Sequence, residues 1–411
     1  MESFLIASKD SASTIATLKS RDKNRILLEM ATALENNSSR IIAQNSKDIK
    51  YGIENNLDSA MLDRLLLDEK RVFAMATSLR EISALKEPVG RVLEGWINDD
   101  NLRIEKVSVP IGVVAVIYES RPNVTSDVGA LCFKSGNVAI LKGGKEAEYS
   151  NQIIATVLQE VLERNGLSKS IISLLPNSSR EGVANLIKMD KYVDLIVPRG
   201  GEALIKYISQ NSSIPVVKHD KGLCHTYIHK DADTQKALKI AINAKCHRPG
   251  VCNAMETLII DKEIAIDILP LLYSEFMKND TLLKGDSEVC KIIDIMLATN
   301  EDFDTEYLAN TLNMKIVNGI DEAIAHIREF GSGHSEAIIT ENYTASEYFM
   351  NQIDAACVYV NASTRFTDGA VFGFGAEVGI STNKLHARGP MGINELTTYK
   401  FKIYGSGQIR A

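Results

Sequence analysis

The sequence predicts an α/β protein with a doubly wound parallel sheet, a second α/β domain and a small β extension. Two observations predict the sheets: from Val113 onward short β-branched runs alternate with amphipathic stretches, and those runs are continuously apolar. A continuous apolar run is typical of a parallel strand that helices cover on both faces. The third observation is the length, because 411 residues are enough for two or three domains with separate cores.

Helices are expected throughout residues 1–90. Apolar residues at three- and four-residue spacings predict them at 15–34, 60–67 and 71–85. Ser11 or Ser13 is the candidate cap for the first of these helices. The pattern then changes, because Leu102 and Ile104 alternate with charged residues, and this alternation predicts a half-exposed strand.

A regular succession of strands and helices follows. Strands are predicted at 113–118, 138–141, 171–174 and 193–197, and helices at 124–133, 149–165, 181–188 and 202–210. A second series starts near Thr226, with helices at 233–244 and 321–330 and strands at 255–260, 337–339 and 357–360. We place a domain boundary near residue 225 and expect an extended chain again after Lys384.

Charge and composition exclude several classes of protein. The chain has 53 acidic and 46 basic side chains, a net charge of −7, which argues against a nucleic-acid partner. Its apolar runs are far shorter than the ~20 residues of a membrane-spanning helix, and its N-terminus lacks the pattern of a signal peptide. Six cysteines without a C-x-x-C pair are most simply reduced thiols. We therefore expect a soluble cytoplasmic protein without a membrane partner.

Cys252 lies in the most unusual segment of the chain. Pro249 and Gly250 precede it and break the predicted helix, so Cys252 belongs to a loop at the end of an element. A thiol acts as a nucleophile when it is ionised, and nearby cations favour that form. Three cations are candidates to supply the field: Lys245, His247 and Arg248. An inert buried thiol is the alternative at this point, and the Cys and His spacing does not match a zinc site, so no metal is expected.

Two predicted strands each end in a cation followed by two glycines. These segments are Lys142-Gly143-Gly144-Lys145 and Arg199-Gly200-Gly201. Ligands bind at the carboxyl ends of parallel strands, glycines allow a close approach to the backbone, and the cations suit a phosphate group. Solvated surface lysines and ordinary turns are the alternative. The strict G-x-G-x-x-G pattern after a strand is absent.

A fourth segment follows the predicted strand that ends at Val360. It contains four hydrogen-bonding or cationic residues suited to an anionic substrate: Asn361, Ser363, Thr364 and Arg365. A turn that satisfies its own backbone is the alternative. Four histidines are expected in polar loops, where a structural or exposed role is commoner than catalysis: His219, His225, His334 and His386.

Together with residues 384–392, these segments resemble the aldehyde dehydrogenase superfamily and, within it, the gamma-glutamyl phosphate reductase family. The resemblance extends over nearly the whole chain. It implies that Cys252 is the nucleophile and that Asn123 donates to the oxyanion, together with the backbone N–H of Cys252. It also implies that Lys142 contacts the adenine ribose or its phosphate and that Glu306 holds the nicotinamide ribose.

The activity implied by the resemblance is the NADPH-dependent reduction of L-glutamyl 5-phosphate to L-glutamate 5-semialdehyde and phosphate. It proceeds through a thioester on Cys252 and is the second step of proline biosynthesis from glutamate. The resemblance leaves Arg248, Arg365 and Asn361 as candidates to bind the phosphoryl group or the α-carboxylate. Lys145 stands where many relatives have a glutamate that binds both ribose hydroxyls, which favours NADPH over NADH.

Three other functions are weighed against this activity. A hydrolytic NAD(P)-dependent aldehyde dehydrogenase needs a glutamate base, and the corresponding stretch 218–222 has none. A thiol hydrolase would pair Cys252 with His219 or His225, and an inactive scaffold would tolerate loss of Cys252. His247 stands where an uncharged amide is expected in the narrower family, and we interpret it as a tolerated substitution rather than one that tunes the thiolate.

The resemblance also implies domain roles and partners. Residues 1–100 and 110–225 are expected to form the NADP-binding domain, and residues 226–384 the catalytic domain. Residues 101–109 and 385–411 are expected to form the β extension, through which copies of the chain associate into a homo-oligomer. A functional link to a separate glutamate 5-kinase is expected, because that enzyme makes the acyl phosphate.

Overall fold

The computed structural model describes residues 1–218 and 221–410. The chain folds into two compact units. The first comprises Met1–His219, Gly373–Ile380 and Pro390–Ala411, and the second comprises Asp220–Phe372 and Ser381–Gly389. Short strands β14 (Gly379–Ser381) and β15 (Gly389–Met391) lie where the chain passes between the units.

The first unit begins with five helices. They are α1 (Glu2–Thr17), α2 (Ser20–Asn36), α3 (Ser38–Glu54), α4 (Ser59–Leu65) and α5 (Glu69–Ala84). The single helix predicted at 15–34 is wrong, because extended backbone at Leu18 and Lys19 separates α1 from α2. The predicted cap is wrong as well, since Ser11 lies inside α1 and its hydroxyl donates to the Ala7 carbonyl. Apolar spacing alone does not reveal a break of only two residues between consecutive helices.

The first unit contains a parallel sheet of four strands, β3 (Val113–Tyr118), β4 (Val138–Lys142), β5 (Ile172–Leu174) and β6 (Leu195–Arg199), in the order β5-β4-β3-β6. The connecting helices are α6 (Asn123–Lys134), α7 (Glu148–Arg164), α8 (Arg180–Leu186) and α9 (Glu202–Asn211). These elements confirm the predicted succession. Because β4 and β6 lie on opposite sides of β3, the sheet is doubly wound, and its switch point is between β3 and β6.

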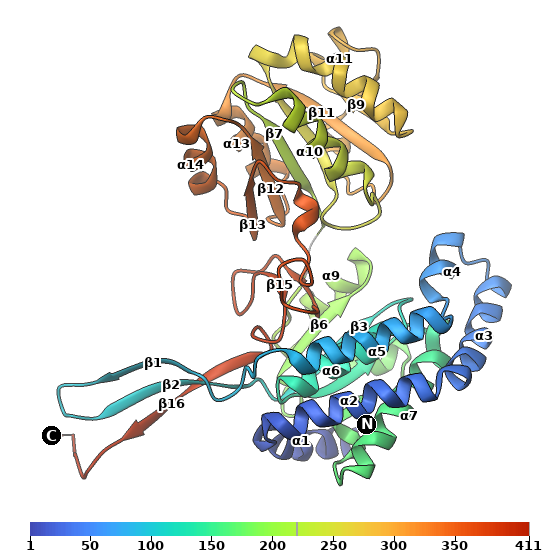
Figure 1. Cartoon of the computed structure of the whole chain (residues 1–411), viewed down its shortest axis with the longest axis vertical. Coiled ribbons are helices and arrows are strands. Elements are labelled where there is room, and N and C mark those ends of the chain that lie inside the picture. Colours follow the sequence, from blue (N-terminus) through green and yellow to red (C-terminus); the bar gives the residue numbers. More distant parts are fainter. Residues whose placement is uncertain (219–220, 411) are drawn as a thin grey trace. The chain divides into compact units, whose positions relative to one another are not determined.

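Three antiparallel strands form the β extension of the first unit: β1 (Val92–Ile97), β2 (Arg103–Pro110) and β16 (Thr397–Tyr404), in the order β1-β2-β16. Trp96 pairs with Ile104, and Tyr399 pairs with Ser108. Figure 1 shows the extension leading away from the helices of its unit, with the C-terminus close to its end.

The second unit is built on seven parallel strands. They are β7 (Cys224–Ile228), β8 (Met255–Asp261), β9 (Leu282–Gly285), β10 (Met296–Leu297), β11 (Thr311–Val317), β12 (Ser335–Ile339) and β13 (Cys357–Val360). Their order is β10-β9-β11-β8-β7-β12-β13. The helices are α10 (Thr234–Cys246), α11 (Lys262–Lys278), α12 (Asn300–Phe303), α13 (Ile320–Phe330) and α14 (Tyr343–Gln352).

Helices cover both faces of this sheet. Leu258 of β8 packs in one buried cluster with residues of α10 and α11, whereas its neighbour Ile259 packs in another with residues of α13 and α14. Successive residues of a strand point to opposite faces, so both faces are buried, as the continuous apolar runs predict. Among the described residues, no helix is both long and apolar enough to cross a membrane.

Candidate active site

The candidate residues are divided between the two units. Asn123 and the two Gly-Gly segments belong to the first unit, and Cys252, Glu306, Arg248, Arg365 and Asn361 belong to the second. The geometry of each group is therefore given within its own unit.

Cys252 is half-buried in the loop between α10 and β8, at the amino edge of the second sheet. Its carbonyl oxygen accepts a hydrogen bond from the Cys224 thiol at 3.2 Å. The next residue, Asn253, donates its amide to the Thr367 carbonyl at 2.7 Å, and its carbonyl accepts the Thr364 hydroxyl at 2.8 Å. The loop is thus held at Cys252 and Asn253 by the strand β7 and by the segment after β13.

Gly222 lies directly against this loop and against Glu306. A Cβ atom at Gly222 would be 2.3 Å from the Cys252 carbonyl oxygen and 2.6 Å from Oε1 of Glu306. Both separations are below van der Waals contact, so glycine is required for these groups to approach. The structure therefore brings Glu306 and the loop of Cys252 together around Gly222.

Asp302 anchors the segment that carries Glu306. Its carboxylate accepts hydrogen bonds from Lys284 Nζ at 2.5 Å, from the Tyr307 hydroxyl at 2.9 Å and from the Thr299 backbone at 2.8 Å. The bond from Lys284 is the largest of the effects that hold the pKa of Asp302 far below its usual range. The segment is therefore tied to β9 on one side and to α12 on the other.

We expect Asp302→Asn to lower the free energy of unfolding by about 2 kcal/mol at neutral pH, because it removes a charged hydrogen-bond acceptor. The pKa of Asp302 is lowered on folding, so its stabilisation is complete above the unfolded value of about 3.9 and is lost as the pH falls below it. Urea unfolding at pH 7, 5 and 3 should show the difference between the variant and the parent shrinking only at pH 3. Asp304→Asn, at a carboxylate that is 62% exposed, is the control and should change stability by less than about 1 kcal/mol.

Lys245 does not supply a free positive charge. Its ammonium group forms a fully buried ion pair with Glu256 at 2.8 Å. Burial lowers the pKa of Lys245, and burial raises the pKa of Glu256 to about 7, with Glu306 raising it further. The expectation that Lys245 supplies the field for Cys252 is therefore corrected, because a neighbouring carboxylate neutralises it.

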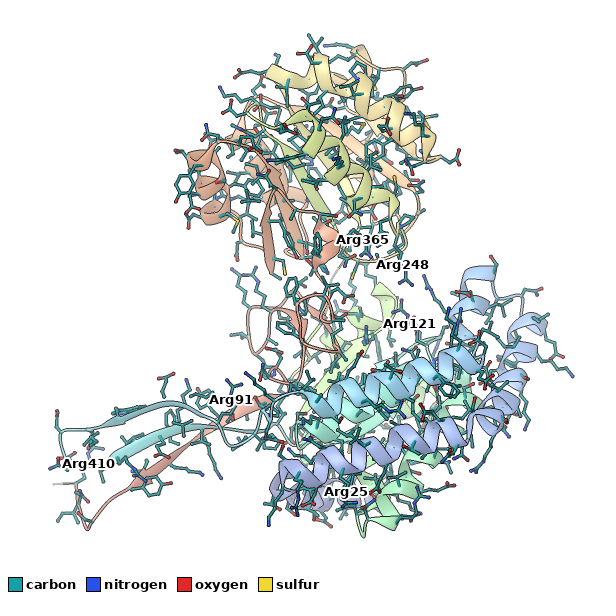
Figure 2. All side chains as sticks on the ribbon, viewed as in Figure 1. Arg25, Arg91, Arg121, Arg248, Arg365 and Arg410 are labelled. Carbon is teal, nitrogen blue, oxygen red and sulfur yellow. The ribbon has the colours of Figure 1, made fainter. Side chains whose placement is uncertain are left out.

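Arg365 is close enough to Cys252 for the two groups to interact through their charges. Burial lowers the pKa of Arg365, the charge of Arg248 lowers it further, and Cys252 has the opposite effect. Figure 2 shows Arg248 and Arg365 close together at one end of the second unit. Arg248 and His247 are exposed, whereas Arg365 is half-buried. Two neighbouring guanidinium groups, one of which interacts with Cys252, fit an anionic substrate.

Two of the expected loop histidines are instead buried. His225 belongs to β7, and its Nδ1 lies 2.9 Å from Oε2 of Glu336, with both side chains 1% exposed. His334 lies just before β12, and its Nδ1 is 2.8 Å from the Ser335 hydroxyl. The prediction of a loop is wrong for His225, which lies in a strand, whereas His334 does lie in a loop but is buried there. The structural role expected for both fits these contacts. His386 is exposed, and His219 and Asp220 lie outside the described residues.

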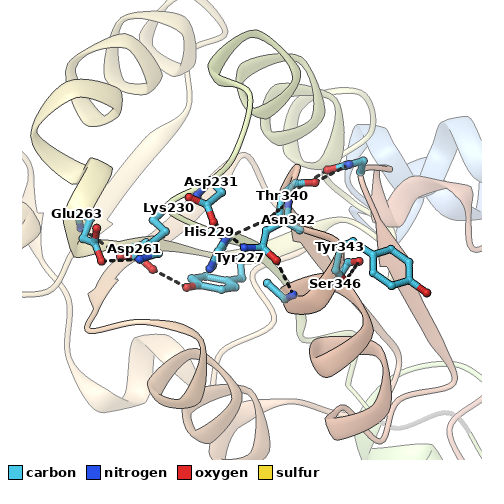
Figure 3. Close-up of polar contacts among 12 residues, drawn as sticks. Tyr227, His229, Lys230, Asp231, Asp261, Glu263, Thr340, Asn342, Tyr343 and Ser346 are labelled. Atoms are coloured by element: carbon cyan, nitrogen blue, oxygen red, sulfur yellow. Dashed lines mark hydrogen bonds and ion pairs between the residues drawn. The ribbon is translucent and has the colours of Figure 1, made fainter.

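Asn361 lies at the carboxyl edge of the second sheet. Its Oδ1 accepts the Thr340 N–H at 2.9 Å and its Nδ2 donates to the Thr340 carbonyl at 2.8 Å. Figure 3 shows the polar network at this edge, in which His229 contacts Thr340 and the Tyr227 hydroxyl donates to Asp261. The side chains drawn at this edge are hydrogen-bonded to protein groups, whereas Cys252 lies at the opposite, amino edge. We therefore assign Asn361 a structural role.

The Gly-Gly segments lie at the carboxyl edge of the first sheet, as predicted. Gly200 and Gly201 follow β6 at the switch point, and Lys142 ends β4. Lys145 is exposed and Lys142 is half-buried, and burial lowers the pKa of Lys142. These cations and the open space around Gly201, where a Cβ atom would have no neighbour within 4 Å, fit an anionic ligand.

Two carboxylates at this edge give no signal in the sequence. Glu146 accepts the backbone N–H and the hydroxyl of Ser120, both at 2.7 Å. Glu119 accepts the N–H of Gly201 at 3.1 Å, so a phosphate binding at that N–H has to displace this carboxylate. Neither contact could be inferred from spacing, because it joins the loops after two different strands.

Asn123 is the first residue of α6, and its side chain is exposed. Its Nδ2 donates to Oδ2 of Asp127 at 2.9 Å. An asparagine amide has two N–H groups, so one is engaged by Asp127 and the other can serve a ligand. Asp127 was not among the candidate residues, although its four-residue spacing from Asn123 on a predicted helix was visible in the sequence.

Comparisons with known proteins identify the family and the fold of the chain. The model of the aldehyde dehydrogenase family matches residues 1–281. The chain is 66% identical over 411 residues to gamma-glutamyl phosphate reductase from Nitratiruptor sp. and 64% identical over 410 residues to that from Sulfurimonas denitrificans, covering all of each. The crystal structure of gamma-glutamyl phosphate reductase from Thermotoga maritima is 40% identical, with a TM-score of 0.98 over 100% of this chain and 99% of that one. An acetylating aldehyde dehydrogenase from Geobacillus thermoglucosidasius shares the fold, with a TM-score of 0.71 over 100% of this chain and 97% of that one. Its sequence is 19% identical. The predicted fold class is confirmed.

Proposed function

Because the chain belongs to the aldehyde dehydrogenase family, and within it to the gamma-glutamyl phosphate reductases, we propose that it reduces L-glutamyl 5-phosphate to L-glutamate 5-semialdehyde and phosphate. As a member of this family it is an oxidoreductase, and the reaction is the second step of proline biosynthesis from glutamate. One observation carries the proposal beyond the family: Cys252 and Glu306 approach one another around Gly222, and the charge of Arg365 interacts with Cys252.

The first half of the proposed reaction forms a thioester. The Cys252 thiolate attacks the acyl carbon, a C–S bond forms, and the carbonyl electron pair moves onto oxygen. The side-chain amide of Asn123 and the backbone N–H of Cys252 donate to this oxyanion, at about 3–4 kcal/mol for each donor. The carbonyl then re-forms, the C–O bond to phosphate breaks, and phosphate leaves, with Arg248 and Arg365 stabilising its charge.

The second half reduces the thioester. A bound nicotinamide cofactor supplies the hydride, and Glu306 is the residue proposed to hold its ribose. The same two donors stabilise the oxyanion again as the thiohemiacetal forms. Its C–S bond then breaks, the carbonyl of the semialdehyde forms, and the Cys252 thiolate is restored.

We propose NADPH as the cofactor that donates this hydride. The support is the exposed Lys145, which lies near Lys142 at the carboxyl edge of the first sheet. Two cations at this edge would bind the 2′-phosphate of NADPH, which NADH lacks. Gly143, Gly144 and the loop at Gly200–Gly201 complete the proposed cofactor site, with Arg199 at the end of β6.

We expect Lys145→Glu to lower the ratio of kcat/KM for NADP to kcat/KM for NAD by about 10–100-fold, because a carboxylate repels the 2′-phosphate. Steady-state kinetics with both cofactors measures the ratio. Lys188→Glu makes the same charge change at another exposed lysine of the first unit and should leave the ratio unchanged. An unchanged ratio in Lys145→Glu would show that this lysine does not select the cofactor.

The test of the proposed function is a steady-state assay in the direction of oxidation. L-glutamate 5-semialdehyde is supplied with NADP or NAD, and phosphate is present or omitted. The reductase requires phosphate for cofactor reduction, because phosphate takes the acyl group from the thioester. Phosphate-independent formation of glutamate would instead indicate the hydrolytic aldehyde dehydrogenase.

The proposal includes a cytoplasmic homo-oligomer, linked functionally to a separate glutamate 5-kinase. The outer strands of the β extension expose eight large apolar or aromatic side chains: Val92, Leu93, Trp96, Ile97, Tyr399, Phe401, Ile403 and Tyr404. Unpaired strand edges with exposed apolar side chains favour association with another chain. Light scattering measures the mass, and a monomer would contradict this part of the proposal.

A further inference from the structure

Asp127 lies one helical turn beyond Asn123 on α6. Residues four apart share a face of a helix, and here the two side chains are joined by the 2.9 Å bond from Asn123 Nδ2 to Asp127 Oδ2. A carboxylate is an acceptor without a donor, so this contact determines which end of the Asn123 amide faces Asp127.

Residues of three elements lie near the Asp127 carboxylate and lower its pKa. Ser78 of α5 and Ser126 of α6 act on it through their side chains, and Arg199 at the end of β6 acts through its charge. Its Oδ1 atom is buried, and burial raises the pKa of Asp127 to about 6, against the effect of these neighbours. Among the described residues, Oδ1 has no hydrogen-bond partner, so the bond from Asn123 to Oδ2 is the contact that orients this buried carboxylate.

We propose that Asp127 is a positioning residue for the oxyanion donor: it holds one N–H of the Asn123 amide so that the other N–H points to the developing oxyanion. The inference rests on the proposed function, because it takes Asn123 to be that donor. Without an acceptor at Asp127, the amide can rotate and present its own oxygen to the oxyanion, which is repulsive. A donor fixed before the reaction avoids this reorganisation.

A purely structural role is the competing explanation. In that case Asp127 ties α5 to α6 through Ser78, and the bond from Asn123 has no effect on the reaction. The two explanations differ in which partner of Asp127 matters. Ser78→Ala removes the contact with α5 and leaves Asn123 in place, so it is the matched control.

The experiment compares five variants of the full chain: Asp127→Leu, Asp127→Asn, Asn123→Ala, Asn123→Ala/Asp127→Leu and Ser78→Ala. Asp127→Leu keeps the size and removes the acceptor, whereas Asp127→Asn retains an acceptor oxygen. The measurements are kcat and KM for phosphate-dependent NADP reduction, and the rate of Cys252 alkylation by iodoacetamide. The alkylation rate reports on the nucleophile without involving the oxyanion.

We expect Asn123→Ala to lower kcat by about 10²-fold. Asp127→Leu should lower kcat by about 10-fold, because the Asn123 amide is still present but is no longer held in its orientation. The KM for NADP and the alkylation rate should be unchanged. Asp127→Asn should recover most of the activity, and Ser78→Ala should match the parent. The double variant should be no slower than Asn123→Ala alone, because the two residues act through one hydrogen bond.

Other outcomes overturn the inference. If the kcat of the double variant falls by the product of the two single effects, Asp127 acts independently of Asn123 and its role is structural. The same conclusion follows if Ser78→Ala lowers kcat as much as Asp127→Leu does. Should Asp127→Leu fail to fold, Asp127→Asn and Ser78→Ala still decide, since loss of activity in Ser78→Ala alone contradicts positioning. If the parent chain does not reduce NADP in a phosphate-dependent reaction, the proposed function itself is refuted. If the parent is active but the effects of Asn123 and Asp127 on kcat are independent, only the positioning role is refuted.

Discussion

Cys252→Ser is expected to lower phosphate-dependent reduction of NADP by at least about 10⁴-fold, a larger loss than removal of the oxyanion donor should cause. The serine hydroxyl fills nearly the same volume, but it is not ionised near neutral pH, even beside guanidinium groups. Without the thiolate no thioester forms, and neither half of the reaction can proceed. Steady-state rates with the semialdehyde, phosphate and NADP measure the loss.

The control for this variant is another half-buried thiol of the second unit. Cys290 donates to the Gly285 and Ile295 carbonyls, away from the nucleophile loop, and Cys290→Ser should keep the parental rate. Circular dichroism and the thermal midpoint should be unchanged in Cys252→Ser. A Cys252→Ser variant with more than about a hundredth of the parental rate would contradict the assignment of the nucleophile.

Gly222→Ala is expected to lower kcat by about 10³-fold, because a displacement of about 1 Å alone can reduce a rate about 10²-fold and here two groups are displaced. The added methyl group would lie 2.7 Å from Cα of Cys252 and 2.6 Å from Oε1 of Glu306. Because the first of these is backbone, the nucleophile loop itself has to move. The measurement is kcat together with the KM for NADP, which should rise if Glu306 holds the ribose.

Gly95→Ala is the matched control for the added methyl group. Gly95 lies in β1, and a Cβ atom there meets only ordinary contacts of 3.7–4.0 Å. Its activity should equal that of the parent. A Gly222→Ala variant with parental kcat would show that the approach of the loop to Glu306 is not needed for the reaction.

Local patterns predicted much of the fold correctly. The apolar runs at 113–118 and 138–141 became β3 and β4, and the Pro249-Gly250 pair placed Cys252 in a loop after α10. These features depend on residues close together in the sequence, which is the range over which spacing and turn preferences act. By contrast, β11 (Thr311–Val317) was missed, because Asn313 and Lys315 interrupt its apolar run.

The candidate site was predicted less completely. The local pattern suggested Lys245 as a source of positive charge, but Glu256, eleven residues later, pairs with it in the interior. It also suggested Asn361 as a substrate ligand, but Thr340, at the end of another strand, takes both ends of its amide. In both cases the partner that decides the role is brought in by the sheet, and no spacing rule identifies it.

The amino-acid order by itself determined which reactive groups the chain offers and on which elements they lie: a thiol in a loop after Pro-Gly, and cations with glycines after parallel strands. The tertiary structure alone decided which of these groups act on one another, as with Gly222 between Cys252 and Glu306, or Glu119 at the N–H of Gly201. The physical reason is range. Periodicity and turn preferences are set by neighbours along the chain, whereas hydrogen bonds, burial and charge depend on distances that only the packed fold establishes.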